Sequence, residues 1–252
     1  GHEVDEGMPV NSVTVTFDRP MRPGSFDPAE DILSFDGPNG SLSVDSWRWL
    51  DEQALELDVY VSTVGEYTLV LGPDILDRSG AALDKNGNLT PGEVGVDDYT
   101  ITFSIDAPTV TGCDTPTLPP VDGVTIHFSH DMDAASFSLT DDLVNFTGPD
   151  GDVVVTGFAW LDSRTLRLET EDSGTGIYSF QLGGAILDAW GNALDAGGYS
   201  KSFSTIMHGT ITEDTTIGGP DTMTIIDGDL RVAPGVTLTI PAGTIVKFSG
   251  AS

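Results

Sequence analysis

The sequence predicts an all-β protein made of two tandem β-sandwiches followed by a short C-terminal β segment. Three observations carry this prediction: an internal repeat without gaps, short segments in which apolar and polar residues alternate, and many Gly, Pro and Asp residues between those segments. Of the 252 residues, 30 are Gly and 15 are Pro, and no window keeps a helical period for three turns. A chain of this length can form two domains of about 100 residues, each with its own core.

The internal repeat defines the domain organisation. Residues 13–84 align with residues 124–195 at a constant offset of 111, and 29 of the 72 aligned positions are identical. Such self-similarity predicts a duplicated domain, with the first copy in residues 1–106, the second in 107–206 and a separate segment in 207–252. The landmarks that match include Met21 with Met132, Trp49-Leu50-Asp51 with Trp160-Leu161-Asp162, and Tyr67 with Tyr178.

The strands of each copy follow from residue alternation. Residues 13–17, 54–59 and 67–71 alternate apolar and polar side chains, which is the period of a sheet with one buried face. Turn residues at roughly ten-residue intervals predict about seven strands per copy. One short helical turn is expected near Phe26 and again near Phe137.

The two copies are predicted to begin differently. Residues 108–111 are expected to form a first strand in the second copy, whereas residues 1–10 hold only a weak counterpart, so the first copy is expected to lack this edge strand or to begin irregularly. The segment 106–122 is predicted to be a stiff joint because it contains Pro108, Pro116, Pro119 and Pro120. Cys113, the only cysteine, is interpreted as an incidental residue of this joint.

Short motifs in both copies resemble a known family. The first copy carries Val13-Thr14-Val15-x-Phe17 with Met21 and Ser25-Phe26, then a tyrosine-bearing strand and Ile75-Leu76-Asp77-x-x-Gly80-x-x-Leu83; the second carries Phe128-Ser129-His130-Asp131-Met132. This pattern resembles the bacterial immunoglobulin-like domains of S-layer and other large secreted surface proteins. The resemblance covers about 13–105 and 108–205. It implies a non-catalytic spacer, stalk or adhesion module, located outside the cell and joined to the remainder of a larger polypeptide.

The tail, residues 207–252, follows a different pattern. Short apolar strands are expected at 223–226, 236–240 and 244–248, separated by Gly, Pro and Asp. Together with Gly209-Thr210-Ile211-Thr212, they resemble the opening rungs of secreted right-handed parallel β-helix proteins, with Ile217 where that family often has an aromatic residue. A solenoid needs about three or more rungs, so the natural protein is expected to continue after Ser252. The alternative is an extension packed on the second sandwich.

The charge balance excludes several functions. There are 10 Lys and Arg residues against 40 Asp and Glu, for a formal net charge of −30, so nucleic-acid binding is excluded and docking on an anionic membrane is disfavoured. No apolar stretch reaches the roughly 18 residues of a membrane-spanning helix, and no membrane insertion is expected.

The N-terminus lacks a signal-peptide profile, and Gly1-His2 resembles a cloning scar, which indicates an excised segment.

A calcium site is predicted in an insertion of the first copy. The acids comprise 30 Asp and 10 Glu, and Asp favours turns and hard-cation sites. Asp84, Asn86 and Asn88 form a D-x-N-x-N loop, although Gly is absent at position six and Glu at position twelve of an EF-hand count. The alternative is a solvated Asn-Gly turn, and the second copy, with Ala196, Gly197 and Gly198 after Asp195, is predicted to have no such site. The seven expected ligands are Asp84, Asn86, Asn88, Thr90, Glu93, Asp97 and Asp98.

No catalytic site is predicted. Ser129, His127, His130 and Asp131 are close in sequence, but neighbouring strand residues point to opposite faces and a triad depends on its three-dimensional arrangement. Asp77 and Asp188 are interpreted as turn formers with Gly80 and Gly191. Met21 and Met132 are expected to fill core gaps, Trp49 and Trp160 to anchor the cores, and Trp47 and Trp190 to be exposed contact residues.

The sequence therefore favours a structural or adhesion spacer of a secreted or cell-surface bacterial protein, stabilised by calcium in its first domain. Two alternatives stay open: a carbohydrate-binding accessory region of a polysaccharide-active enzyme, and the start of a pectin-lyase-like catalytic β-helix whose groove lies after Ser252. The expected partners are polysaccharide or other cell-surface components and the rest of the parent polypeptide.

Overall fold

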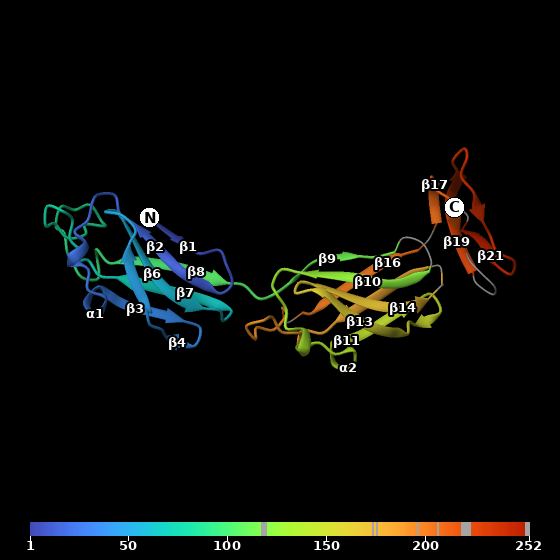
Figure 1. Ribbon diagram of the computed structural model, residues 1–252, viewed down its shortest axis with the longest axis horizontal. Coiled ribbons are helices and arrows are strands. Elements are labelled where there is room, and N and C mark those ends of the chain that lie inside the picture. The colour runs from blue at the N-terminus through green and yellow to red at the C-terminus, as the bar shows by residue number, and fades with distance from the viewer. Residues whose placement is uncertain are drawn as a thin grey trace. The chain divides into compact units, whose positions relative to one another are not determined.

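The chain forms two compact units that are almost entirely β-structure (Figure 1). The computed structural model describes residues 1–116, 120–172, 174, 176–195, 197–205, 207–217 and 223–249, with only the backbone described at 223 and 249. The first unit is Gly1–Asp106 and the second is Ala107–Ser252. The predicted all-β fold class is confirmed.

The first unit is a sandwich of two four-stranded antiparallel sheets. One sheet has the order β1-β2-β6-β5 and the other the order β4-β3-β7-β8. If β1 to β8 are given the letters A, B, C, C′, D, E, F and G, the two sheets are ABED and C′CFG. This is the strand arrangement of an immunoglobulin-like sandwich. The elements are β1 (His2–Val4), β2 (Val10–Thr16), η1 (Pro23–Ser25), α1 (Pro28–Asp31), β3 (Ile32–Gly37), β4 (Gly40–Ser41), β5 (Ser46–Trp49), β6 (Ala54–Val61), β7 (Gly65–Leu71) and β8 (Tyr99–Ile105).

The second unit begins with a sandwich of the same topology. Its sheets have the orders β9-β10-β14-β13 and β12-β11-β15-β16, element for element as in the first unit. The one-turn helices α1 and α2 lie just after Phe26 and Phe137, where helical turns were predicted. The elements are β9 (Val110–Asp114), β10 (Val121–Phe128), η2 (Ala134–Ser136), α2 (Leu139–Asp142), β11 (Leu143–Gly148), β12 (Gly151–Asp152), β13 (Val155–Asp162), β14 (Thr165–Asp172), β15 (Ile177–Leu182) and β16 (Tyr199–Ser204).

The repeat extends further towards the N-terminus than sequence identity indicates. His2 is opposite Val15, and Cys113 is opposite Ile126, so the offset of 111 holds through the first strand of each copy. The expectation that the first copy lacks this strand was wrong, because an edge strand is held by its backbone ladder and needs no alternation of side chains.

The predicted joint at 106–122 is also corrected. Strand β9 occupies 110–114, so the connection between β8 and β9 is only the four residues 106–109. Pro116 and Pro120 lie between β9 and β10 inside the second copy; Pro119 lies outside the described residues. Cys113 is therefore a strand residue that packs against the second core, and its burial raises the thiol pKa to about 11.

Each sandwich has its own hydrophobic core, built from matching residues. Leu55 and Leu57 of β6 are fully buried in the first, and Leu166 and Leu168 of β14 are fully buried in the second. Met21 and Met132 are buried in the respective cores, and Trp49 and Trp160 pack against them, as predicted. Because side chains alternate across a strand, the leucines of β6 and β14 share one inward face.

A buried tyrosine near the start of the seventh strand of each sandwich is hydrogen-bonded to the backbone of the preceding turn. The Tyr67 hydroxyl donates to the Thr63 carbonyl oxygen at 2.6 Å, and the Tyr178 hydroxyl donates to the Gly174 carbonyl oxygen at 2.7 Å. The Tyr67 ring stacks on Phe103 with ring centroids 5.0 Å apart. A tyrosine bonded to backbone a few residues upstream is the tyrosine corner of immunoglobulin-like sandwiches, and both copies contain it.

The tail forms parallel strands, unlike the sandwiches. Strands β17, β19 and β21 make one parallel sheet (Figure 1). Strands β18 and β20 make a second parallel sheet. Met207, Ile211, Ile217 and Ile226 are buried together between successive strands. The described chain thus passes through the two sheets in alternation, with one register shift in the β17–β19 ladder between Met207 and Gly209. The strands are β17 (Met207–Ile211), β18 (Thr215–Thr216), β19 (Met223–Val232), β20 (Leu238–Thr239) and β21 (Ile245–Ser249).

Candidate functional site

The two copies differ most in the connection between their last two strands. In the first copy this connection is residues 72–98, which is 27 residues, and in the second it is 183–198, which is 16 residues. The first copy therefore carries 27 − 16 = 11 additional residues. They fall in the segment that contains the predicted calcium ligands.

Both connections start with the same aspartate-centred turn. Asp77 Oδ1 accepts from the N–H groups of Ser79 and Ala81 at 2.8 and 2.9 Å, and Gly80 has a φ of +88° that a side chain would strain. Asp188 makes the same turn with Gly191, as predicted. The hydrogen bond from the Ser79 hydroxyl lowers the pKa of Asp77 most, and the backbone hydrogen bonds from Ala81 and Ser79 lower it further. The ionised carboxylate therefore stabilises the folded state at pH values above the pKa that Asp77 has in the unfolded chain. This stabilisation is lost as the pH falls through the lower pKa that Asp77 has in the folded state.

Five of the predicted calcium ligands are linked by hydrogen bonds at the start of the insertion. The Asn88 N–H donates to Asp84 Oδ1 at 3.1 Å and to Asn86 Oδ1 at 2.7 Å, so these two oxygens converge on one point. Asn88 Nδ2 donates to Glu93 Oε2 at 2.6 Å, which draws the glutamate to the same place. Thr90 joins through its N–H, which donates to Asn88 Oδ1.

The other two predicted ligands organise the end of the loop. Asp97 is fully buried, and its carboxylate accepts from the N–H groups of Lys85, Asn86 and Glu93 at 3.1–3.4 Å. Asp98 Oδ2 accepts from the Gly95 N–H at 3.0 Å, while Asp98 Oδ1 is buried and has no hydrogen-bond partner among the described residues. Asp97 therefore links the two ends of the loop through its carboxylate. Asp98 has one buried carboxylate oxygen without a hydrogen bond in the described part of the chain.

The loop turns sharply at Leu89, the sixth position counted from Asp84. Leu89 has a φ of +70° and is the one residue other than glycine with a positive φ in the part of the chain that the structure describes. The Leu89 N–H donates to Asp84 Oδ2 at 3.0 Å. An EF-hand loop makes its sharp turn at position six with glycine, so the backbone bends here at the same position despite the leucine, whose side chain is 89% exposed.

The oxygen donors of this loop are of mixed kinds. Across the described ranges, no three His, Cys, Asp or Glu side chains gather closely enough to form a metal site by themselves. The set at 84–93 consists of two carboxylates, two amides and a nearby backbone segment. Calcium accepts carboxylate, amide and carbonyl oxygens alike, so the chemistry of the donors fits this ion, and the buried Asp98 Oδ1 is a further oxygen without a bond.

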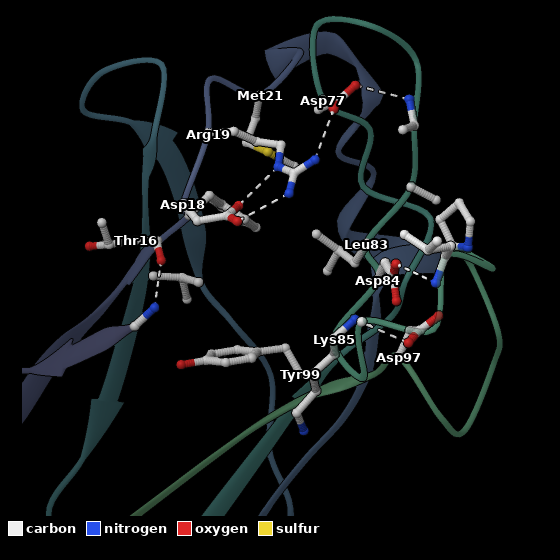
Figure 2. A pocket seen from close by; sticks show the side chains of 18 residues that line it. Thr16, Asp18, Arg19, Met21, Asp77, Leu83, Asp84, Lys85, Asp97 and Tyr99 are labelled. Carbon is white, nitrogen blue, oxygen red and sulfur yellow. Dashed lines mark hydrogen bonds and ion pairs between the residues drawn. The ribbon is translucent and has the colours of Figure 1, made fainter.

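A groove of about 680 Å³ borders the insertion in the first sandwich. One wall is the end of β2 with Phe17, Asp18 and Arg19, and the other is Leu83 with the residues that follow it (Figure 2). Tyr99 lies between the walls in Figure 2, and the Lys85 ammonium is 5.8 Å from the centre of its ring. The sequence did not predict this groove, because it depends on how residues far apart in the chain come together in space.

An arginine joins two acids on one wall of this groove. Arg19 donates from Nε to Asp18 Oδ1 at 3.1 Å, and its Nη1 lies 3.7 Å from Asp77 Oδ2 (Figure 2). The Arg19 side-chain hydrogen bond is the main cause that lowers the pKa of Asp18. The Arg19 guanidinium thus offsets one of the two carboxylate charges on this wall.

The residues considered for a hydrolytic set in the second copy do not form one. Ser129 Oγ and His130 Nδ1 are 2.7 Å apart, but the Asp131 carboxylate accepts from Ser163 Oγ and Arg164 Nε at 2.7 and 2.8 Å. The Arg164 guanidinium is the main cause that lowers the pKa of Asp131. The Asp131 carboxylate therefore forms an ion pair with Arg164 and does not orient His130 as a triad would require.

Trp47 and Trp190 were both predicted to be exposed, and the structure confirms this for Trp47 alone. Trp47 packs edge to face on Phe26 with ring centroids 5.0 Å apart, and Phe158 packs on Phe137 in the same way at 4.9 Å. Both rings are equally exposed, at 37% and 38%, so Trp47 fills the same packing position as its counterpart. Trp190 is half-buried. Trp47 is therefore exposed as predicted, although its ring also packs on Phe26, whereas Trp190 is less exposed than predicted.

The comparisons with known proteins identify no family. No protein-family model matches the chain, and no curated protein matches it. No helix in the described ranges has the length and apolar character that crossing a bilayer requires. Solved structures with similar folds include native alpha-2-macroglobulin from Escherichia coli, spanning domains MG0-NIE-MG1, at 14% identity and a TM-score of 0.34, with 81% of this chain and 69% of that chain covered.

Two similar structures come from Bacteroides. One is SGBP-B of the mixed-linkage glucan utilization locus of Bacteroides ovatus in complex with a mixed-linkage heptasaccharide, at 15% identity and a TM-score of 0.27, covering 77% of this chain and 40% of that one. The other is SGBP-B from a complex xyloglucan utilization locus of Bacteroides uniformis, at 12% identity and a TM-score of 0.23, covering 79% and 48%. The chain thus spans less than half of each Bacteroides protein, and similarity at this level assigns no function.

Proposed function

We propose that this chain is a non-catalytic spacer or adhesion region of a large secreted or cell-surface bacterial protein. One observation carries the proposal: the same immunoglobulin-like sandwich occurs twice in direct succession, with one strand order and one register, and each copy is closed around its own core. A connection of four residues follows the first copy. Repeated modules with separate cores and short connections suit a role in spacing.

The tail supports placement within a longer secreted protein. Its strands pair in parallel in two sheets and enclose a small apolar core, which is how the coils of a parallel β-helix stack. We propose that residues 207–249 are the first rungs of such a helix, and that the two sandwiches present or space it. The acidic surface, with a net charge of −30, would limit self-association of such a protein.

A glycan-binding experiment separates this proposal from its main alternative. Purified chain is expected to show no turnover on an array of marine and plant polysaccharides, measured by release of reducing ends, and its retention on the same array is measured in parallel. Turnover would contradict the non-catalytic proposal. Without turnover, saturable binding would favour an adhesion or carbohydrate-binding region over a plain spacer, and the absence of binding would favour the spacer.

We further propose that calcium binds the insertion of the first sandwich. The ligands would be the side-chain oxygens of Asp84, Asn86, Asn88 and Glu93, with the Thr90 carbonyl; the Asp84 and Asn86 oxygens already meet at the Asn88 N–H. Asp98 would supply its unbonded buried oxygen, and Asp97 would hold the loop closed around the ion. Calcium would neutralise part of this acidic loop and fix its 15 residues, 84–98.

Calcium is expected to raise the melting temperature of the first sandwich. An ion that binds only the folded form at 100 times its Kd adds about 2.7 kcal/mol to the free energy of unfolding. The measurement is a thermal melt in millimolar calcium and in chelator, followed by hydrogen exchange of peptides from each copy. The second sandwich is expected to melt unchanged.

Matched variants make this test specific. Asp84→Ala is expected to abolish the calcium-dependent shift, although it also removes bonds to Asn88 and Leu89 and so lowers the melting temperature in chelator. Asp195→Ala, at the matching position of the second copy, is expected to leave the shift intact. A melt that does not respond to calcium, or a shift that survives in Asp84→Ala, would refute the site.

A further inference from the structure

The insertion of the first sandwich contains an asparagine that is followed directly by a glycine. The carbonyl carbon of an asparagine side chain can be attacked by the backbone nitrogen of the next residue, which closes a succinimide ring. Glycine permits this attack best, because no side chain stands beside its nitrogen and its backbone adopts the widest range of conformations. The chain contains this dipeptide twice, as Asn39-Gly40 and as Asn86-Gly87.

The loop holds the Asn86 side chain close to the nitrogen of Gly87. Asn86 Oδ1 accepts from the Asn88 N–H at 2.7 Å, which forms an Asx turn. In such a turn the side chain folds back along the peptide that follows it, so the carbonyl carbon of Asn86 faces the Gly87 nitrogen. The same hydrogen bond withdraws electron density from the carbonyl group and makes its carbon a better electrophile.

The Gly87 nitrogen is the free nucleophile of this loop. Among the described residues, the Gly87 N–H has no acceptor. A Cβ atom at Gly87 would meet no atom within 4 Å, and Asn86 is exposed. Attack by this nitrogen therefore breaks no hydrogen bond, and water reaches the ring that forms. The surrounding N–H groups all donate to side-chain oxygens of the loop; they belong to Lys85, Asn86, Asn88, Leu89 and Thr90.

The other Asn-Gly dipeptide lies in a paired structure. Pro38 and Asn39 form the connection between β3 and β4, and Gly40 is opposite Gly37 in the antiparallel ladder. The nitrogen of Gly40 thus belongs to a hairpin whose pairing fixes the orientation of its peptide. Ring closure at Asn39 requires this peptide to rotate out of the hairpin, so the fold hinders the reaction there.

We propose that Asn86 and Gly87 form a self-modification site, at which the chain replaces the Asn86 amide with a carboxylate. The Gly87 nitrogen loses its proton to solvent and forms a bond to the carbonyl carbon of Asn86. The bond between that carbon and the side-chain nitrogen breaks, and this nitrogen takes up a proton from water and leaves as ammonia. Water then opens the succinimide at either carbonyl group, and the product is aspartate or isoaspartate at position 86.

The reaction changes the ligands of the insertion, and only this consequence rests on the calcium site proposed above. Aspartate at position 86 adds a third carboxylate to those of Asp84 and Glu93, and the charge of the ligands tunes calcium affinity. Isoaspartate instead routes the backbone through the side chain and disrupts the Asx turn to Asn88. Bound calcium is expected to slow the reaction, because ring closure pulls Asn86 Oδ1 away from the ion.

The reaction is followed in the purified chain at mildly alkaline pH in chelator, by mass spectrometry of peptides that contain position 39 or 86. In the folded chain, Asn86 is expected to react about tenfold faster than Asn39. Its rate is expected to rise with pH, because the Gly87 nitrogen attacks after it has lost its proton. In urea, the two dipeptides are expected to react at similar rates. A folded chain in which Asn86 reacts no faster than Asn39, or a difference that persists in urea, would overturn the proposal.

Calcium separates this proposal from the calcium site. At about 10 times its Kd, free calcium is expected to slow the reaction at Asn86 about tenfold and to leave Asn39 unchanged. A melting temperature that does not respond to calcium would refute the calcium site, while the rates in chelator would still decide the reaction. A melting temperature that rises without slowing the reaction would show that Asn86 is not a ligand and would overturn the effect on calcium.

Two matched variants test the effect of the product. Asn86→Asp carries one of the two products and is expected to lower the midpoint of the calcium titration several-fold, measured through the melting temperature. Asn39→Asp installs the residue that the second copy has at position 150 and is expected to leave this midpoint unchanged. Equal midpoints in the two variants would overturn the proposed effect on calcium.

Discussion

Leu57→Ala is expected to lower the free energy of unfolding of the first sandwich by about 3 kcal/mol and to leave the second unchanged. Leu57 is fully buried on the inward face of β6. Replacing a buried leucine with alanine removes apolar contacts and leaves a cavity, at a loss of about 2–5 kcal/mol. Since each copy is closed around its own core, the effect is confined to one copy.

The measurement is urea unfolding, followed by hydrogen exchange of peptides from each sandwich. Leu168→Ala, the matched change in β14, is expected to destabilise only the second sandwich by a similar amount. Leu161→Ala, at a position that is 59% exposed, is the surface control and is expected to be nearly neutral. Equal destabilisation of both sandwiches by Leu57→Ala would contradict the independence of the two cores.

Gly37→Ala is expected to lower the free energy of unfolding of the first sandwich by about 2–3 kcal/mol. A Cβ atom at Gly37 would lie 2.7 Å from Cε1 of Tyr67, which is too close for two carbon atoms. The ring cannot move away easily, because Phe103 stacks on it and its hydroxyl is bonded to the Thr63 carbonyl. The substitution therefore breaks the tyrosine corner or distorts β3.

Two further variants define the cause of this effect. Gly148→Ala places a Cβ atom 2.8 Å from Cε1 of Tyr178 and is expected to destabilise the second sandwich in the same way. Gly24→Ala meets no atom within 4 Å and installs the alanine that the second copy has at position 135, so it is expected to be neutral or slightly stabilising. Neutral behaviour of Gly37→Ala in urea unfolding would show that the tyrosine ring is not confined as described.

The strands that the sequence predicts well are those with one buried face. Residues 54–59 alternate because β6 contributes to the core on one side only, and the structure places β6 at 54–61. The strand β1 was missed because its three residues include a single apolar side chain, and its position depends on backbone bonds to β2. Prolines near β9 were mistaken for a joint because proline is common both in linkers and at the ends of edge strands.

The candidate site was only partly accessible from sequence. The spacing of Asp84, Asn86 and Asn88 brings their side chains to one turn, as the structure has it, because alternate residues of a tight loop face the same side. Asp97 was predicted as one of three acids in the loop that could supply the closing carboxylate, and in the structure its carboxylate accepts from three backbone N–H groups. The groove could not be predicted, because it depends on how Phe17, Leu83 and Tyr99 come together in space.

The constant register of the two copies has a consequence for folding. Strands β2 and β10 face equivalent partners, β6 and β14, in the same alignment. During refolding, each therefore finds two acceptable partners in one chain, and exchange of strands between neighbouring repeats is a characteristic error of tandem proteins. The connection that leads to β8 is eleven residues longer than the connection that leads to β16. This difference disfavours exchange of β8 and β16, because each strand would then follow a connection that is too long or too short for its new position.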